Sequence, residues 1–211
     1  MDNKTGIIRR IFMNLPNKIT VSRIIISVIV LIMMVFPFYQ VGFTWPTFLV
    51  AGRLEVSLKY LICAVLFIIA SATDFLDGHI ARKYNMVTDF GKVMDAIADK
   101  ILVNGILITL AVDGFIPAAI PVIIITRDTF VDSIKMVAGQ KGGKAVGASI
   151  WGKIKTICMM SGVSLMLLYN LPFELINIKV ADALIVIATI LSVISGIQYY
   201  NSYKDSLFKE M

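Results

Sequence analysis

Residues 58–112 read LKYLICAVLFIIASATDFLDGHIARKYNMVTDFGKVMDAIADKILVNGILITLAV. This stretch contains two long apolar runs joined by a short polar segment, and four aspartates lie where the runs meet it. Because a bilayer-spanning helix needs about 20 mainly apolar residues, each run is long enough to cross a membrane. The short connection predicts that the two helices are antiparallel neighbours. The stretch therefore predicts a helical hairpin in a membrane, with acidic residues gathered at one end.

Four further apolar segments accompany this hairpin. Together they predict an all-α integral membrane protein with six transmembrane helices, folded as a single membrane domain over residues 1–211. The expected spans are residues 19–38, 58–81, 90–112, 115–136, 154–171 and 181–200. Residues 1–17 precede the first span, and Arg9 and Arg10 lie there among apolar neighbours. This mixture predicts a short helix lying in the membrane interface, at residues 6–15.

The composition of the whole chain favours a membrane protein and excludes several other classes. Of its 211 residues, 58% are hydrophobic and 16% are charged, and the mean hydropathy is +0.84. In soluble globular proteins, about 45–50% of the residues are apolar and about 25% are charged. A disordered chain and a disulfide scaffold are excluded. The net charge of +6 suits a membrane surface or phosphorylated ligands, but no long basic face separates from the apolar runs, so we expect no nucleic-acid partner.

The basic residues predict the orientation of the chain, because cytoplasmic loops of membrane proteins are enriched in Lys and Arg. With the N-terminus in the cytoplasm, only Arg53, Lys59 and Lys179 fall on the far side, and the other 17 of the 20 basic residues lie in or next to cytoplasmic segments. We therefore expect a multi-pass protein of the plasma membrane with both termini in the cytoplasm. The four aspartates then lie at the cytoplasmic end of the helices.

These aspartates are unusual inside membrane helices, where an acidic residue costs about 2.5–3.5 kcal/mol on insertion scales. Asp74 and Asp77 are three residues apart, and Asp95 and Asp99 are four apart, so each pair projects from one helix face. Four neighbouring carboxylates repel one another unless protons or cations neutralise them. Oxygen ligands favour hard divalent cations such as Mg²⁺, Mn²⁺ or Ca²⁺ over zinc, and four acids suit two such ions.

Two other interpretations of the four aspartates remain open. In the first, each acid pairs with a nearby basic residue at a helix end and binds no metal. Those basic residues are Arg82, Lys83, Lys92 and Lys100. In the second, the protein is a divalent-cation transporter, which also needs acids in its spans. Against a transporter, the acids cluster at one face of the membrane rather than at its midplane, and the chain has no inverted repeat.

The spacing of the acids and of small residues between them resembles the motif of the CDP-alcohol phosphatidyltransferase family. The matching residues are Asp74, Asp77, Gly78, Ala81, Arg82, Gly91, Asp95 and Asp99. The six-span layout, with the motif at the ends of spans two and three, is similar as well. The resemblance implies a transferase that attacks a CDP-linked phosphate, expels CMP and uses two divalent cations, Mg²⁺ or Mn²⁺.

The resemblance also implies a role for each motif residue. It makes Asp74, Asp77 and Asp95 metal ligands, and it makes Asp99 both a ligand and the base that takes the proton from the attacking hydroxyl. CDP-diacylglycerol would be bound by five residues: Asn17, Thr20, Gly78, Arg82 and Thr88. Thr20 also fits as the N-cap of the first span. Arg23, one turn further, would reach a phosphate or extend to the interface.

Within the family, the chain is most similar to the phosphatidylglycerophosphate synthase branch, which joins CDP-diacylglycerol to sn-glycerol 3-phosphate. The similar segments are residues 14–23 and residues 152–156. The chain departs from that branch at Ala96, where proline is usual, and at residues 157–160, where a glutamine is common. Cardiolipin, phosphatidylserine and phosphatidylinositol phosphate synthases therefore remain alternatives. Dimers are common among the proteins that the chain resembles, and a homodimer is a further expectation.

A separate group of basic residues predicts a site for the anionic acceptor. Arg127 lies in an otherwise apolar span, and Lys153 and Lys155 open the next one. We predict that these three residues bind glycerol 3-phosphate. In the alternative interpretation, Arg127 pairs with Asp128 or Asp132, and the lysines only reflect the orientation of the chain.

Overall fold

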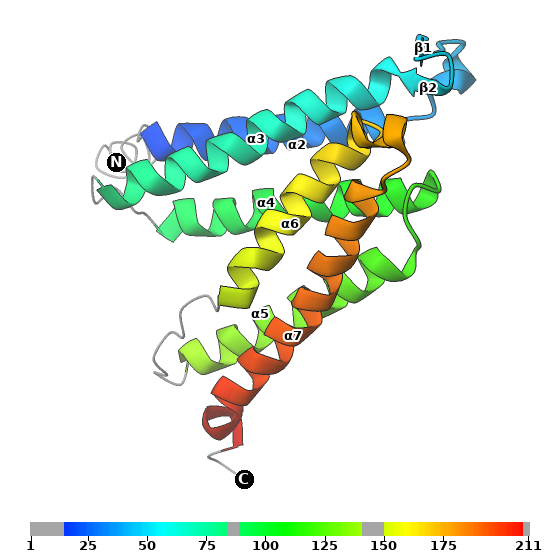
Figure 1. Cartoon of the computed structure of the whole chain (residues 1–211). Helices are drawn as coiled ribbons and strands as arrows, with labels where there is room; N and C mark the ends of the chain where they lie inside the picture. Colours follow the sequence, from blue (N-terminus) through cyan, green and yellow to red (C-terminus); the bar gives the residue numbers. More distant parts are fainter. Residues whose placement is uncertain (1–14, 84–88, 141–149, 209–211) are drawn as a thin grey trace, which may run out of the picture. The chain divides into compact units, whose positions relative to one another are not determined.

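The computed structural model describes residues 15–83, 89–140 and 150–208 (Figure 1). Within these ranges, the side chains of residues 15–16, 75–83, 89–90, 92, 138–140 and 205–208 lie outside the described part. The predicted interfacial helix before the first span lies outside the described residues too. The chain forms two compact units, Met1–Thr109 and Leu110–Met211, and each is described by itself.

Six long helices make up most of the described chain. They are α2 (Leu15–Val35), α3 (Leu58–Lys83), α4 (Asp89–Val112), α5 (Ala119–Gln140), α6 (Ile150–Leu167) and α7 (Val180–Phe208). Each predicted span coincides with one of them. The main differences are that α2 begins four residues earlier than predicted, that α5 begins four residues later, that α6 begins and ends four residues earlier, and that α7 continues beyond the predicted end at Tyr200. The helical prediction is therefore confirmed for the described residues.

The helices have the apolar character that a bilayer requires. Within the described residues, three segments are both long and apolar enough to cross a membrane: Asn17–Val35, Ile150–Leu167 and Val180–Lys204. Large apolar side chains also cover the outward faces; Ile25 and Ile190, for example, are 56% and 54% exposed. Helices that are apolar both inside and outside are typical of a protein in lipid. The chain is a helical membrane protein.

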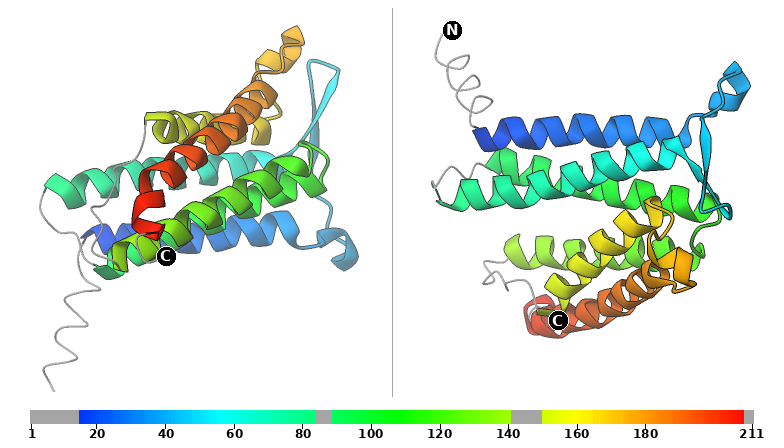
Figure 2. Two further views of the ribbon diagram at one scale, coloured as in Figure 1. Left: turned by 90° about the horizontal axis from the view of Figure 1, so that it is seen from below. Right: turned by 45° about the horizontal axis from the view of Figure 1, so that its top comes forward.

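In the first unit, α2 packs along α3 (Figure 2). It also contacts α4 through individual side chains. Gly105 on α4 lies so close to Leu31 on α2 that a Cβ at this position would collide with the leucine side chain. Further along both helices, the Thr109 hydroxyl lies 3.6 Å from the sulfur of Met34. Because the contacts advance together along both sequences, α2 and α4 run parallel. The small residue at the crossing lets the two membrane helices approach closely.

A β-hairpin, which the sequence did not predict, connects α2 and α3. A short 3₁₀ helix, η1 (Phe38–Val41), follows α2, and then β1 (Thr47–Val50) pairs antiparallel with β2 (Leu54–Ser57). The ring of Phe38 makes edge contacts with Trp45 at 5.3 Å and with Phe36 at 4.9 Å between centroids. These aromatic contacts fix the chain as it leaves α2.

The second unit is built around α7, which packs against both α5 and α6 (Figure 2). A second 3₁₀ helix, η2 (Phe173–Ile176), connects α6 to α7. Gly162 on α6 faces Ile185 on α7, where a Cβ would lie 2.8 Å from the isoleucine Cγ1. On the other side of α7, Gly196 faces Arg127 on α5. Small residues at both contacts therefore bring the three helices together.

Candidate active site

The buried face of α2 changes from polar to apolar along the helix. Buried residues recur every three or four positions, as expected for one helix face. They are Asn17, Thr20, Arg23, Ser27, Val30 and Met34. The first four are polar, and the last two are apolar. A buried polar stripe in a membrane helix is expensive, and it marks this end of α2 as the end that carries a function.

Arg23 is the central residue of this polar stripe. Its side chain is only 2% exposed, and its Nη1 contacts Oδ1 of Asp74 on α3 and lies 2.8 Å from Oδ1 of Asp95 on α4. The two carboxylates are much more accessible, at 40% and 49% exposed. The structure thus brings the first aspartate of one predicted pair together with the first aspartate of the other. Asp74 and Asp95 share one guanidinium group.

This arrangement corrects two sequence-based interpretations. Thr20 is not the N-cap of the first span, because α2 already includes Leu15 and Thr20 is a buried residue in its second turn. Arg23 does not extend to the membrane interface either. Its carboxylate partners are 51 and 72 residues away in sequence, and they hold the guanidinium inside the unit.

The other motif residues are described only in part. Asp99 lies one turn after Asp95 on α4 and is half-buried. Asp77, Gly78 and Arg82 are in the helical backbone of α3, but their side chains are outside the described part. Thr88 is outside the described residues altogether.

The described side chains decide only part of the metal prediction. No group of three or more His, Cys, Asp or Glu residues gathers as a metal site among them. The pairing of Asp74 with Asp95 through Arg23 is observed. The cluster of four carboxylates stays a prediction.

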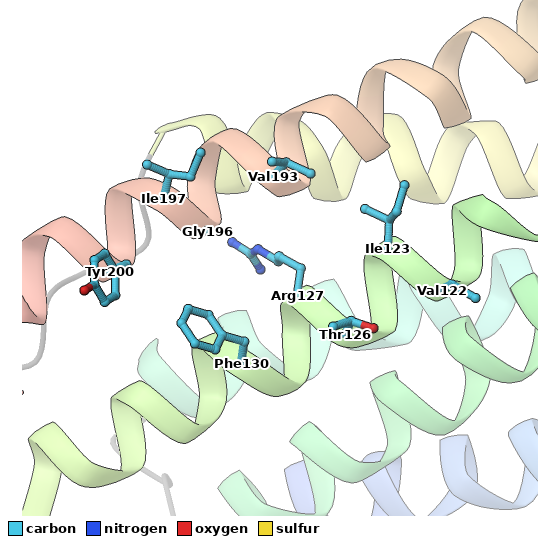
Figure 3. Close-up of a pocket in the computed structure, with 9 residues that line it drawn as sticks. All are labelled: Val122, Ile123, Thr126, Arg127, Phe130, Val193, Gly196, Ile197 and Tyr200. Atoms are coloured by element: carbon cyan, nitrogen blue, oxygen red, sulfur yellow. The ribbon is translucent and has the colours of Figure 1, made fainter.

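A second polar cluster lies in the other unit, around Arg127 on α5. Figure 3 shows its side chain extending from α5 toward Gly196 on α7. Arg127 Nε donates to the carbonyl oxygen of Ser192 at 2.8 Å, and Nη2 donates to the hydroxyl of Ser195 at 2.6 Å. A Cβ on residue 196 would lie 3.1 Å from Arg127 Cγ, so the glycine leaves room for the arginine. Neither serine was predicted, because small polar residues in an apolar span are also common packing residues.

Two cations of this cluster share the carboxylate of Asp128. Arg127 Nη1 and Lys155 Nζ on α6 each lie 2.7 Å from Asp128 Oδ1. The alternative pairing of Arg127 with Asp128 is therefore confirmed. Lys155 takes part in the cluster as well, whereas Lys153 is exposed and lies two residues earlier, on a different face of α6. Arg127 and Lys155 therefore meet at one carboxylate, that of Asp128.

An apolar groove of about 620 Å³ lies beside Arg127, between α5 and α7. Its walls are mainly aliphatic and aromatic side chains, including Ile123, Phe130, Val193 and Tyr200 (Figure 3). The aromatic ring of Tyr199, one residue before Tyr200, lies 4.5 Å from the Nζ of Lys135 and 5.9 Å from the Cζ of Arg127. The groove is open and apolar, as expected for a helix surface that contacts lipid.

Comparison with known proteins decides the family. A model of the family described as CDP-alcohol phosphatidyltransferase matches residues 13–195, which include both polar clusters. The chain belongs to this family. The resemblance of the aspartate motif is thereby confirmed, and the chain is a transferase of the CDP-alcohol phosphatidyltransferase type.

Individual relatives carry a more specific name, CDP-diacylglycerol–glycerol-3-phosphate 3-phosphatidyltransferase. The protein of that name from Bacillus subtilis (strain 168) is 42% identical, over 92% of this chain and 97% of its own length. A Rickettsia felis protein is 32% identical over 92% of this chain and 98% of its own. A Haemophilus influenzae protein is 33% identical over 77% of this chain and 88% of its own length.

Proposed function

We propose that this CDP-alcohol phosphatidyltransferase transfers the phosphatidyl group of CDP-diacylglycerol to sn-glycerol 3-phosphate, which yields phosphatidylglycerophosphate and CMP for phospholipid biosynthesis. One observation carries this assignment. It is the 42% identity, over almost the full length of both chains, to a relative named for this reaction. Fold alone would not choose the acceptor, because one fold serves several reactions.

Asp74, Asp77, Asp95 and Asp99 would hold two divalent cations, Mg²⁺ or Mn²⁺. The described residues fit such a site, because Asp74 and Asp95 already approach one cationic group and offer only oxygen ligands. Arg23 contacts both of these carboxylates from the buried side. When bound, the cations would neutralise the pyrophosphate and lower the pKa of the attacking hydroxyl.

The residues of the chain then have separate tasks in the reaction. The carboxylate of Asp99 takes the proton of the acceptor hydroxyl. The hydroxyl oxygen forms a bond to the phosphorus that carries diacylglycerol, the bond from this phosphorus to the bridging oxygen breaks, and CMP leaves with that electron pair. Five residues hold the liponucleotide: Asn17, Thr20, Gly78, Arg82 and Thr88. Asn17 and Thr20 are 3% and 5% exposed and lie on the same face of α2 as Arg23, which supports their part in this task.

Arg127, Lys153 and Lys155 are proposed to bind glycerol 3-phosphate. The support is that Arg127 and Lys155, from two different helices, meet at the carboxylate of Asp128. Two neighbouring cationic groups would attract a phosphate dianion, and the planar guanidinium of Arg127 suits phosphate oxygens. Lys153, exposed at the start of α6, would add a mobile positive charge.

In the membrane, the six long helices are proposed to be six spans of a single membrane domain. The protein would lie in the plasma membrane, with both termini and the aspartates on the cytoplasmic side. Residues 1–17 would lie in the membrane interface. The bias of basic residues supports this orientation. A homodimer is a further proposal, which measurement of the mass in detergent would test.

The test uses the purified full-length protein with CDP-diacylglycerol, glycerol 3-phosphate and Mg²⁺ or Mn²⁺. We expect CMP release that depends on glycerol 3-phosphate. Serine, inositol phosphate and phosphatidylglycerol are supplied as alternative acceptors in parallel. If CMP is released with one of these acceptors and not with glycerol 3-phosphate, that acceptor replaces glycerol 3-phosphate in the proposal. If none of the four acceptors supports CMP release, the proposed reaction is overturned.

A further inference from the structure

Arg23 belongs to neither half of the aspartate motif, yet it contacts both. We infer that Arg23 is a positioning residue that holds Asp74 and Asp95 from the buried side in the geometry that binds divalent cations. This inference rests on the proposed metal dependence, and it adds a function for a residue outside the motif.

Burial is the first argument. An arginine in a membrane helix normally extends its long side chain to the interface, where its charge is hydrated. Arg23 is instead 2% exposed and contacts two carboxylates. Leaving the guanidinium unpaired in this buried position would be strongly unfavourable, so Arg23 depends on its carboxylate partners.

The position of the contacts is the second argument. The same nitrogen, Nη1, contacts Oδ1 of Asp74 and Oδ1 of Asp95, so the guanidinium sets the spacing between acids on two different helices. Both carboxylates are nevertheless 40% or more exposed, whereas Arg23 lies beneath them. A cation therefore has access from the exposed side while Arg23 stays in place below.

The backbone of α2 is the third argument, because it keeps Arg23 in this position. The buried hydroxyl of Ser27, one turn further, donates to the carbonyl oxygen of Arg23 at 2.8 Å. Arg23 would in turn orient the metal ligands Asp74 and Asp95. Mutating a residue that orients metal ligands typically weakens metal affinity 10- to 100-fold. Loss of Arg23 would let the two acids repel each other and move apart.

The test measures Mn²⁺ affinity of the full-length protein in detergent after removal of metal, by calorimetry or by electron paramagnetic resonance. We expect Arg23→Gln to bind Mn²⁺ about 10- to 100-fold more weakly than wild type. Arg23→Lys should recover most of this loss, because one bridging nitrogen suffices for the two contacts. Lys18→Gln removes the same charge from an exposed position on the same helix and should bind Mn²⁺ like wild type.

Each result has a defined meaning. Unchanged affinity in Arg23→Gln would reduce Arg23 to a packing residue, and tighter binding would show that it competes with the cation; either result overturns the inference alone. If the wild-type protein itself binds no Mn²⁺ saturably, the proposed metal site fails, and the inference fails with it.

A measurement on wild type covers the case in which Arg23→Gln does not fold. In protein with ¹⁵N-labelled arginine, the Arg23 signal is assigned as the one that Arg23→Lys lacks. We expect its guanidinium protons to remain protected from exchange with water when Mg²⁺ is added. Loss of that protection on addition of Mg²⁺ would overturn the inference.

Discussion

The guanidinium of Arg23 lies 2.8 Å from the carboxylate of Asp95, although 72 residues separate them in sequence. The contact places the N-terminal parts of α2 and α4 at the same level. It agrees with the parallel course of the two helices that the contact of Leu31 with Gly105 shows. Since Asp74 contacts the same guanidinium, three helices contribute to one polar end of the unit.

Asp99→Asn should abolish turnover and leave the protein folded. An amide cannot take the proton of the acceptor hydroxyl, and loss of a general base typically costs about 10²- to 10⁴-fold in rate. CMP release measures turnover, and circular dichroism with thermal unfolding measures folding. Asp113→Asn, an exposed position just beyond α4, is the control and should keep wild-type activity. Near-normal activity of Asp99→Asn would remove the base assignment.

Removal of divalent metal should stop the reaction reversibly. EDTA is expected to reduce CMP release to background, and Mg²⁺ or Mn²⁺ added in excess should restore it. Zn²⁺ should restore little, because an all-oxygen ligand set favours hard cations. Full activity in EDTA after prolonged dialysis would contradict the proposed cofactors.

Arg127→Gln should raise the KM for glycerol 3-phosphate by about tenfold or more, with a much smaller change in the KM for CDP-diacylglycerol. The reason is that one charge-assisted contact to phosphate is worth about 1.5–3 kcal/mol. Lys179→Gln, which removes an exposed charge before α7, is the control. The reverse pattern, with the liponucleotide affected more, would overturn the acceptor assignment.

Gly196→Val tests the same site without removing any charge. A Cβ at residue 196 would lie 3.1 Å from Cγ and 3.2 Å from Nε of Arg127, so the larger side chain must displace the arginine. We expect a higher KM for glycerol 3-phosphate and a loss of stability of about 1–3 kcal/mol from overpacking. Ser202→Val introduces the same side chain at an exposed position of α7 and should change neither quantity. Wild-type kinetics of Gly196→Val would separate Arg127 from acceptor binding.

Local pattern accounts for the helices and for the family motif. Apolar runs of about 20 residues predict spanning helices whatever their partners are, and the spacing of Asp74, Asp77, Asp95 and Asp99 is a property of the sequence itself. The β-hairpin of residues 47–57 was not predicted, because its local pattern is too weak. Two strands of four residues are too short for their alternation to be distinguished from a loop.

Sequence by itself therefore determined that the chain is a helical membrane protein with an acidic motif typical of one transferase family. Only the tertiary structure decided how Arg23 and Arg127 are used. Each was open to two or more interpretations, because the energy of a buried charge depends on partners that the sequence leaves distant. Asp74 and Asp95 for Arg23, and Ser192 and Ser195 for Arg127, become neighbours only when the helices pack.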